Sequence, residues 1–265
     1  MLTTEVDNFP GFPEGIQGPD LMMKMRKQAE RFGATILDKS ATSVDFTKTP
    51  FEIFAGSEKY LAKTVVIATG AQNVWLGVPG EKELIGRGIS TCAPCDAPFF
   101  KNKVVAVVGG GDTAMEESSV LTKYASKVYL IHRRDALRAS SLMQEKVKKN
   151  PKIEIIWNTV VREIVGTEKV EGLKLFNQST NETSQLTVDG VFIAVGHKPE
   201  SEIFKGIIET DERGFIKIQE GSKTNVPGVF VAGDVHDYRY KQAITAAGFG
   251  CMAALDTLQY LSENN

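Results

Sequence analysis

The chain has 265 residues, a formal net charge of −2, and 42% hydrophobic and 24% charged residues, which is ordinary for a folded domain protein. This charge balance predicts no general attraction to nucleic acid or to an anionic membrane surface. No apolar run has the length of a membrane span, residues 1–7 lack the features of a signal peptide, and three cysteines do not make a secreted disulfide scaffold, so we expect a cytoplasmic protein.

The first third of the chain predicts one helix and several short strands. Residues 2–19 are rich in Pro and Gly and indicate a loop, and Asp20 is expected to cap a helix from Leu21 to Arg31. Residues 64–71 form a continuous apolar strand that runs into a glycine turn, which is typical of a buried parallel strand. Residues 73–90 contain several Gly and are expected to form a linker. Other strands are expected at 34–37, 43–46, 51–54 and 60–61.

A second unit begins at Lys103. Strand 104–108, a glycine loop, a helix over 113–124 and strand 127–132 predict a βαβ unit. Two later strands, 191–196 and 229–234, also end in glycine turns, which favours parallel sheets that hold ligands at their carboxyl ends. We therefore expect an α/β fold. The remaining predicted elements are helices over 140–149 and 242–260 and strands at 153–157, 160–165, 170–176 and 186–188.

The glycine loop predicts a nucleotide site. The run Gly109-Gly110-Gly111-Asp112-Thr113-Ala114 fits G-x-G-x-x-A and lies between a strand and a helix. Its first glycine allows a tight turn, the second allows close approach of a pyrophosphate, and the small alanine allows close packing of helix and strand. The helix N-terminus adds N–H donors and a positive dipole.

The residues that follow the next strand indicate which nucleotide is bound. An NAD site usually has an acidic residue there, but this strand is followed by Arg133 and Arg134, and then by Arg138. Arginine side chains suit a 2′-phosphate because they are always charged and bind it bidentately. The sequence thus favours NADP, and the alternative is a solvated basic turn.

The run Cys92-Ala93-Pro94-Cys95-Asp96 predicts a reversible dithiol and disulfide. Zinc is disfavoured because a tetrahedral site needs four ligands, and neither Cys251 nor the histidines have suitable spacing. An unreactive structural pair is the other alternative. A helix that begins at this motif would lower the pKa of a thiol. Asp96 is expected to transfer a proton or only to cap a helix, and Cys251 is expected to be a small buried apolar residue.

These motifs together resemble a known family. The matching stretches are Glu5–Gly11, Ala68–Ala71, Cys92–Asp96, Gly109–Ala114 with Glu116 and Glu117, His132–Asp135, Val195–His197, Gly233–Val235 and Gln242–Ala243. Over essentially its whole length the chain resembles low-molecular-weight thioredoxin reductases, of the class II pyridine nucleotide-disulfide oxidoreductase family.

The resemblance implies a flavoprotein of two three-layer, ββα-type FAD/NAD(P)-binding domains with parallel central sheets. An NADPH domain at 74–202 is inserted into an FAD domain formed by 1–73 and 203–265. In the family, NADPH reduces FAD, FAD reduces the disulfide, and the dithiol reduces the partner thioredoxin after the NADPH domain rotates. The family is usually homodimeric.

The resemblance also implies the role of each site residue. Cys95 is expected to face the flavin, Cys92 to attack thioredoxin, and Asp96 to be the acid. The NADPH residues are then Gly109, Gly111, Asp112, Thr113, Ala114, Arg133, Arg134 and Arg138. The FAD residues are Asn8, Thr69, Gly70, Asp234, Val235, Lys241, Gln242 and Ala243.

The chain departs from the family pattern at several places. Pro94 stands where the family usually has Thr, Ala97-Pro98 where it has Gly-Phe, and Lys241 where it has Arg. The sequence begins downstream of the family's first glycine loop, which binds the FAD pyrophosphate. We therefore expect an incomplete chain with exposed apolar surface and weak flavin binding.

Two alternative functions remain. The electron path is the same if the acceptor is another thiol protein, such as a peroxiredoxin. A truncated chain is alternatively a non-catalytic module that binds NADPH without turnover. A ferredoxin–NADP reductase is disfavoured because that group lacks the cysteine pair.

Overall fold

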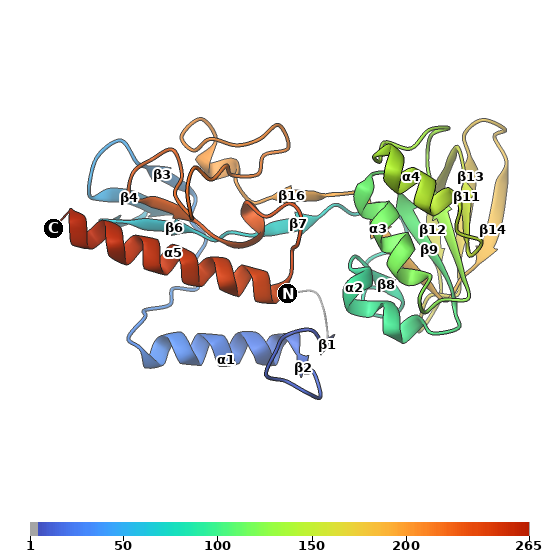
Figure 1. Ribbon diagram of the computed structural model, residues 1–265, viewed down its shortest axis with the longest axis horizontal. Coiled ribbons are helices and arrows are strands. Elements are labelled where there is room, and N and C mark those ends of the chain that lie inside the picture. Colours follow the sequence, from blue (N-terminus) through green and yellow to red (C-terminus); the bar gives the residue numbers. More distant parts are fainter. Residues whose placement is uncertain (1–4, 265) are drawn as a thin grey trace. The chain divides into compact units, whose positions relative to one another are not determined.

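The computed structural model describes residues 5–264 and divides the chain into two compact units (Figure 1). Unit 1 comprises Asn73–Gly196 and the described residues up to Asp7, and unit 2 comprises Asn8–Gln72 and His197–Asn265. The chain leaves unit 1 a few residues before the expected boundary at 202. Residues 2–4 of the expected N-terminal loop lie outside the described residues.

Unit 1 is built on a parallel sheet of five strands in the order β11-β10-β9-β15-β8. Crossover connections, which parallel pairing requires, join β9 to β10 through α3 and β10 to β11 through α4. The predicted βαβ unit is confirmed, because β9 pairs with β10 in register from Val104 with Lys127 onwards. The strands are β8 (Ile89–Ser90), β9 (Val104–Gly109), β10 (Lys127–Ile131), β11 (Ile153–Ile156) and β15 (Gly190–Ala194).

Both faces of this sheet are buried. Val105 and Val107 of β9 belong to a core cluster with Met115 of α3 (Asp112–Leu121) and Val147 of α4 (Ser141–Lys148). The alternate residues of β9 pack instead with an antiparallel sheet on the opposite face. Burial on both sides explains the uninterrupted apolar run in the sequence. The antiparallel strands are β12 (Thr159–Val165), β13 (Gly172–Asn177) and β14 (Thr183–Thr187).

Unit 2 repeats these layers on a smaller scale. The parallel strands β6 (Val65–Ile67) and β17 (Val229–Val231) lie between α5 (Ala243–Glu263) and an antiparallel sheet. Phe230 of β17 contacts the α5 side, and Val229 and Val231 contact the other side. The expected α/β class with parallel strands is confirmed. The antiparallel strands are β3 (Ser43–Asp45), β4 (Phe51–Ala55) and β5 (Glu58–Ala62), and α1 (Gly18–Arg31) precedes them (Figure 1).

Short elements complete both units. β7 pairs with β16 where the chain passes between the units. These elements are β1 (Glu5–Val6), β2 (Ile16–Gln17), β7 (Ala71–Asn73), β16 (His197–Pro199), α2 (Ala93–Asp96), η1 (Ala97–Phe100), η2 (Glu202–Phe204) and η3 (Gly233–Val235).

The prediction for the start of α1 was wrong. The helix begins at Gly18 and not at Leu21, and its N-cap is Gln17 rather than Asp20. Pro19 lies in the first turn, where a missing N–H costs nothing. Asp20 also lies in this turn, where its negative charge favours the helix dipole.

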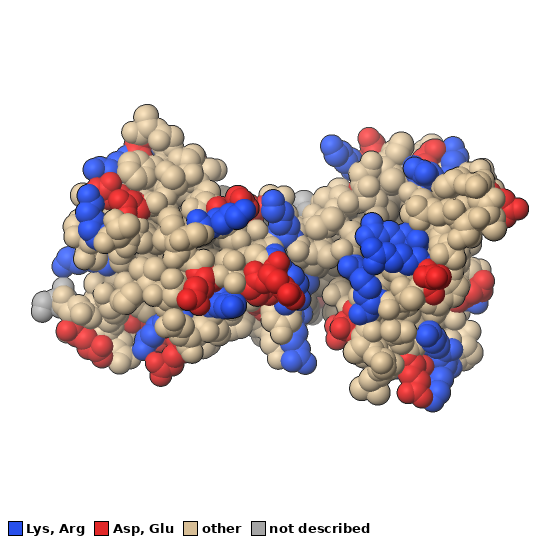
Figure 2. Space-filling model, turned by 90° about the horizontal axis from the view of Figure 1, so that it is seen from above, with Lys and Arg blue, Asp and Glu red and all other residues tan. Residues whose placement is uncertain are grey.

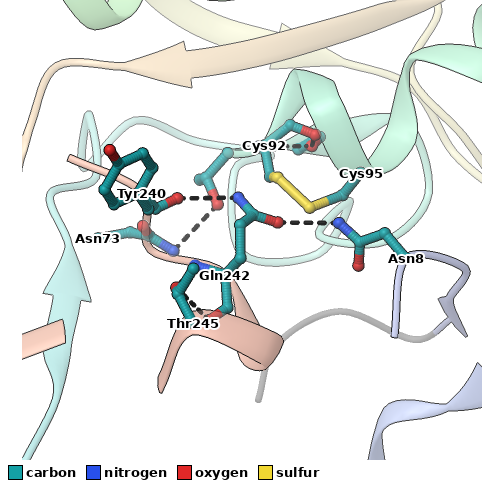
Figure 3. The surroundings of a disulfide bond; sticks show 9 residues. Asn8, Asn73, Cys92, Cys95, Tyr240, Gln242 and Thr245 are labelled. Carbon is teal, nitrogen blue, oxygen red and sulfur yellow. Dashed lines mark hydrogen bonds between the residues drawn. A yellow bond between two sulfur atoms is a disulfide. The ribbon is translucent and has the colours of Figure 1, made fainter. Parts of the chain in front are cut away.

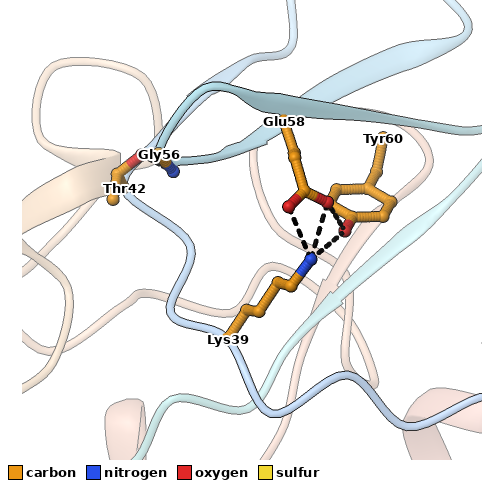
Figure 4. A network of polar contacts seen from close by, with 5 residues as sticks. All are labelled: Lys39, Thr42, Gly56, Glu58 and Tyr60. Carbon is orange, nitrogen blue, oxygen red and sulfur yellow. Dashed lines mark hydrogen bonds and ion pairs between the residues drawn. The ribbon is translucent and has the colours of Figure 1, made fainter.

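The expected strand at 34–37 is absent, and side-chain contacts hold the two residues that follow it. Asp38 accepts hydrogen bonds from Arg26 on α1 at 2.7 and 2.9 Å. Lys39 Nζ lies 2.6 Å from both carboxylate oxygens of Glu58 at the start of β5, and Tyr60 donates to the same carboxylate (Figure 4). These pairs are exposed, and exposed pairs contribute little stability.

The expected linker at 73–90 is instead an ordered part of unit 1. Glu81 is only 2% exposed, and its carboxylate accepts hydrogen bonds from the backbone N–H groups of Leu76 and Gly77 at 2.8 and 2.7 Å. Leu84 lies in the core beside β15 and the antiparallel sheet. The glycines that suggested flexibility serve tight turns, since Gly77, Gly80 and Gly86 have positive φ.

On the face shown in Figure 2, acidic and basic side chains are interspersed over both units. In the part of the chain that the structure describes, no helix has the length and apolar character needed to cross a membrane.

Candidate active site and nucleotide-binding sites

The C-x-x-C motif forms a disulfide in unit 1 (Figure 3). Cys92 and Cys95 are joined by an S–S bond of 2.07 Å, with their Cα atoms 5.3 Å apart. Cys92 is the N-cap of α2, and its carbonyl oxygen accepts hydrogen bonds from the N–H groups of Cys95 and Asp96. Pro94 and Pro98 both lie in first turns, of α2 and η1 respectively. The two prolines that depart from the family pattern are therefore accommodated without loss of a helical hydrogen bond.

Ser90 connects the disulfide loop to Asp96. The backbone N–H of Cys92 donates to Ser90 Oγ at 3.0 Å, and Ser90 also forms a side-chain hydrogen bond with Asp96. Burial raises the pKa of the half-buried Asp96 carboxyl, the hydrogen bond from Ser90 opposes this, and the nearby Asp7 charge adds to it. A carboxyl group with a raised pKa beside a disulfide is suited to exchange a proton with a thiolate.

A cavity of about 340 Å³ opens in unit 1 beside this loop. Ser90 and Asp96 form part of its wall. Basic and aromatic side chains form much of the remainder, namely Arg87, Lys103, Lys169 and Phe99.

The glycine loop connects β9 to α3, as predicted. A Cβ on Gly109 would lie 2.4 Å from the carbonyl oxygen of Ala194 and 2.7 Å from Cβ of Ala114, so glycine allows the close packing here. Gly111 is the N-cap of α3, and a Cβ at this position would meet no atom within 4 Å. The loop is therefore tightly packed against β15 and α3 at Gly109, and it has free space at Gly111.

Asp112 has a structural role within this loop. Its Oδ1 accepts hydrogen bonds from the backbone N–H and the hydroxyl of Ser140, at 2.8 and 3.0 Å. Ser140 is the N-cap of α4, so Asp112 connects the first residue of α3 with the start of α4. Thr113 follows it in α3, and Ala114 is fully buried against the sheet.

The arginine loop, residues 133–139, follows β10 and lies against the glycine loop. The carbonyl oxygen of Gly110 accepts the N–H groups of Arg138 and Ala139 at 2.7 and 3.2 Å. The side chains of Arg133, Arg134 and Arg138 are exposed, and among residues 5–264 none of them forms an ion pair. Three unneutralised guanidinium groups therefore lie on a loop bonded directly to the glycine loop.

In unit 2, the predicted FAD residues cluster at the carboxyl ends of two adjacent parallel strands. Thr69 and Gly70 follow β6, and Asp234 and Val235 follow β17. Because β6 and β17 pair in parallel, these segments share one edge of the sheet. The hydroxyl of Thr69 donates to the carbonyl oxygen of Glu200 at 2.5 Å, and Gly70 has a φ of 75°.

The start of α5 is fixed by side-chain amides. Asn8 Nδ2 donates to Gln242 Oε1 at 2.9 Å, and Gln242 Nε2 donates to the carbonyl oxygen of Tyr240 at 3.0 Å (Figure 3). Gln242 is the N-cap of α5, and Ala243 is its first residue. Asn8 and Gln242, which are far apart in the sequence, are thus brought together in unit 2.

Asp234 and Lys241 are the charged groups of this cluster. Asp234 Oδ1 is buried and has no hydrogen-bond partner among the described residues, and burial raises the pKa of its carboxyl group. Lys241 has a φ of 49°, and its Nζ lies 2.8 Å from Nδ1 of His197. Burial, followed by the charge of Lys241, lowers the pKa of His197 to about 4, so the neutral ring accepts a hydrogen bond from Lys241.

Sequence reasoning missed three residues of these sites. Ser90, His132 and His197 act through hydrogen bonds to groups that are distant in the sequence or on the backbone, and no local pattern marks these contacts. The prediction for Cys251 was wrong, because this cysteine is exposed. It lies two positions from Ala253, the buried residue of α5, and so on the opposite side of the helix.

The fold and the disulfide define an oxidoreductase with dinucleotide-binding architecture. The pattern of the pyridine nucleotide-disulphide oxidoreductase family matches residues 1–250. The chain belongs to this family.

Several relatives are thioredoxin reductases. Thioredoxin reductase 1, mitochondrial, of Arabidopsis thaliana is 53% identical over 98% of this chain and 72% of its own length. The thioredoxin reductase of Streptomyces clavuligerus is 51% identical over 99% of this chain and 82% of its own length. Among solved structures, thioredoxin reductase from Giardia duodenalis has a TM-score of 0.93 at 43% identity, covering 98% of this chain and 86% of that one. Thioredoxin reductases of this family use FAD and NADPH.

Proposed function

We propose that this chain is an NADPH-dependent reductase that passes electrons through FAD to the Cys92–Cys95 disulfide and then to thioredoxin. The observation that carries the proposal is the Cys92–Cys95 disulfide at α2, with Ser90 hydrogen-bonded both to the backbone N–H of Cys92 and to the Asp96 carboxyl group, whose pKa is raised. A disulfide and an acid held on one short helix are the parts needed for thiol–disulfide exchange. Thioredoxin as the acceptor is supported by the relatives that bear its name.

Unit 1 is the proposed NADPH domain. The open position at Gly111 leaves room for a pyrophosphate against the backbone, and the N-terminus of α3 supplies N–H donors. Arg133, Arg134 and Arg138 have no carboxylate partner among the described residues, which suits binding of a 2′-phosphate. Gly109 and Ala114 would hold the strand and helix close together, and Asp112 and Thr113 complete the loop.

Unit 2 is the proposed FAD domain. The buried Oδ1 of Asp234 lacks a partner among residues 5–264, and a hydroxyl or N–H group of a bound cofactor would satisfy it. The remaining candidate residues lie at the same edge of the sheet or at the start of α5. They are Asn8, Thr69, Gly70, Val235, Lys241, Gln242 and Ala243.

When bound, NADPH would supply a hydride and FAD would pass its electron pair to the disulfide. Two electrons and two protons convert the disulfide into two thiols. Cys92, as a thiolate, then attacks one sulfur of the acceptor disulfide and forms a mixed disulfide. Cys95 next attacks the Cys92 sulfur, which releases the acceptor as a dithiol and restores the Cys92–Cys95 bond. Asp96 holds the proton that is given to, or taken from, these sulfur atoms.

Counting thiols tests the proposal directly. The oxidised chain has one free cysteine, Cys251, and it is exposed. With FAD added under anaerobic conditions, NADPH should raise the number of titratable thiols from one to three. The variant Cys251→Ser is the matched control and should give zero titratable thiols before NADPH is added and two afterwards. A count that stays at one would show that NADPH does not reduce the disulfide, and would overturn the proposal.

The acceptor is tested separately. Cys92→Ser should abolish NADPH-dependent reduction of thioredoxin, because Cys95 alone cannot release a mixed disulfide. Thioredoxin and a peroxiredoxin are compared at equal concentrations with the wild-type chain. Faster reduction of the peroxiredoxin would leave the electron path intact and overturn thioredoxin as the acceptor.

A further inference from the structure

A buried histidine joins the two loops of the proposed NADPH site. His132 follows β10 and is 4% exposed. Its Nδ1 lies 2.9 Å from the carbonyl oxygen of Gly109 in the glycine loop, and its Nε2 lies 3.0 Å from the carbonyl oxygen of Ala136 in the arginine loop. A neutral imidazole can donate to one of these oxygens, and an imidazolium can donate to both.

The ring of His132 is held in place on several sides. A Cβ on Gly110 would lie 2.2 Å from Cε1 of the ring, so the ring fills the space beneath the loop. Trp157 packs against it edge-on, with the ring centroids 6.2 Å apart. The backbone N–H of His132 donates to Ile156 at 2.9 Å, and its carbonyl oxygen accepts from Thr159 at 2.9 Å. The ring therefore projects from a fixed backbone.

We propose that His132 is a positioning residue for selection of the 2′-phosphate, through its Nε2 contact with Ala136. The inference rests on the proposed NADPH site. Within the described chain, the side chains of Arg133, Arg134 and Arg138 have no ion pair to orient them, so the loop backbone determines where they lie. That backbone is fixed at its far end by the two N–H bonds to Gly110 and by Gln144, which donates to Leu137 and Ala139. Asn158 donates to the carbonyl oxygen of Arg134, and His132 makes the contact at Ala136, between these points.

Two substitutions separate the two contacts of the ring. Nδ1 of histidine is bonded to Cγ, as is Nδ2 of asparagine, so His132→Asn retains a donor near Gly109 and loses the contact with Ala136. Nε2 is one bond further out, like Nε2 of glutamine, so His132→Gln retains a donor near Ala136 and loses the contact with Gly109. Asparagine is one methylene group smaller than glutamine, so His132→Asn removes more packing. A general loss of packing affects both ligands alike, so the ratio of their affinities is the readout that separates the two contacts.

The test uses adenosine 2′,5′-bisphosphate and 5′-AMP, which differ only in the 2′-phosphate. Their dissociation constants are measured by calorimetry on the full chain and its variants, so that no flavin or turnover is required. The wild type should prefer the bisphosphate, and His132→Asn should reduce this preference by up to about tenfold, as expected for loss of one partly buried hydrogen bond. His132→Gln should weaken both ligands and change their ratio by less than about threefold.

Each result has a definite meaning. Equal loss of preference in both variants, or loss in neither, would show that His132 only fills space. A wild type without any preference for the bisphosphate would instead overturn the proposed NADPH site itself. If His132→Asn does not fold, the wild type is followed by ¹⁵N NMR of the ring. A shift at Nε2 with the bisphosphate and not with 5′-AMP would support the proposal, and equal shifts would overturn it.

Discussion

Replacing either Gly110 or Gly111 of the nucleotide loop by serine should separate the packing role of Gly110 from the ligand-binding role proposed for Gly111. A Cβ at Gly110 would lie 2.2 Å from Cε1 and 2.3 Å from Nδ1 of His132. Carbon atoms in contact are normally about 3.5–4.0 Å apart, so the ring has to move by more than about 1 Å. At Gly111 an added Cβ meets nothing within 4 Å. Neither glycine has a positive φ, so the two positions differ in space and not in backbone strain.

The expected loss of stability for Gly110→Ser follows from this overlap. Overpacking costs about 1–3 kcal/mol, and displacing the ring weakens hydrogen bonds worth about 1 kcal/mol, which gives about 2–4 kcal/mol in all. For a unit of this size the melting temperature should fall by about 8–16 °C. Gly111→Ser should change the free energy of unfolding by less than about 0.5 kcal/mol, because serine is also a good N-cap residue.

Nucleotide binding should show the opposite order. The side chain in Gly111→Ser occupies the open space against which a pyrophosphate is proposed to lie, so NADPH affinity should fall at least about tenfold. Melting is followed by circular dichroism, and binding by calorimetry below the melting temperature of the weaker variant. A Gly110→Ser chain that melts with the wild type would refute the packing argument. A Gly111→Ser chain that binds NADPH normally would refute the position of the ligand.

The other predictions concern groups whose environment the structure defines. Ser90→Ala removes a hydrogen bond that lowers the pKa of Asp96, so this pKa should rise. The limb of the pH–rate profile that depends on the Asp96 carboxyl group should then move to higher pH. An unchanged profile would contradict the role of Asp96 in proton transfer. Asp96→Asn should reduce turnover about a hundredfold or more while NADPH affinity stays constant, as measured by stopped-flow kinetics and calorimetry. Burial raises the folded-state pKa of Asp234, so the folded state loses stability as the pH rises through that pKa and the carboxyl group ionises. The melting temperature of Asp234→Asn should therefore exceed that of the wild type at pH 8 but not below pH 3.8. An equal gain in melting temperature at both pH values would be inconsistent with this cause. Replacing Arg133 and Arg134 by Ala should raise KM for NADPH about tenfold to a hundredfold and leave KM for NADH nearly unchanged, and equal changes in both constants would argue against binding of the 2′-phosphate.

The sequence was sufficient for the elements whose pattern is local and strong. The apolar strands β9, β15 and β17, which end in glycine turns, are buried on both faces, and this leaves an uninterrupted apolar run that needs no tertiary information to recognise. The run of β6 is equally apolar in sequence, although its middle residue Val66 is 40% exposed. The glycine loop was equally legible, because G-x-G-x-x-A between a strand and a helix has few other uses. The C-x-x-C pair was also predicted from the sequence to form a redox-active disulfide, because two cysteines at this spacing have few other uses.

Elements that depend on partners elsewhere in the chain could not be predicted. The two residues of β8 form a strand only because β15 lies beside them, and Glu81 gives residues 73–90 order by accepting hydrogen bonds from a turn that contains Gly77. Residues 34–37 have the composition of a strand, but neighbouring side chains from α1 and β5 hold the following residues instead. Local propensity is a weak guide where tertiary contacts decide the pairing.

The sequence by itself determined the chemistry: two cysteines three positions apart, a dinucleotide loop, and arginines after the next strand. Only the tertiary structure decided how these groups are supported. It places Ser90 between Cys92 and Asp96, His132 between the glycine and arginine loops, and His197 beside Lys241. Motifs are legible because chemistry requires particular residue types at fixed spacing. Supporting hydrogen bonds join residues that are distant along the chain or backbone groups that every residue has, so they leave no local pattern.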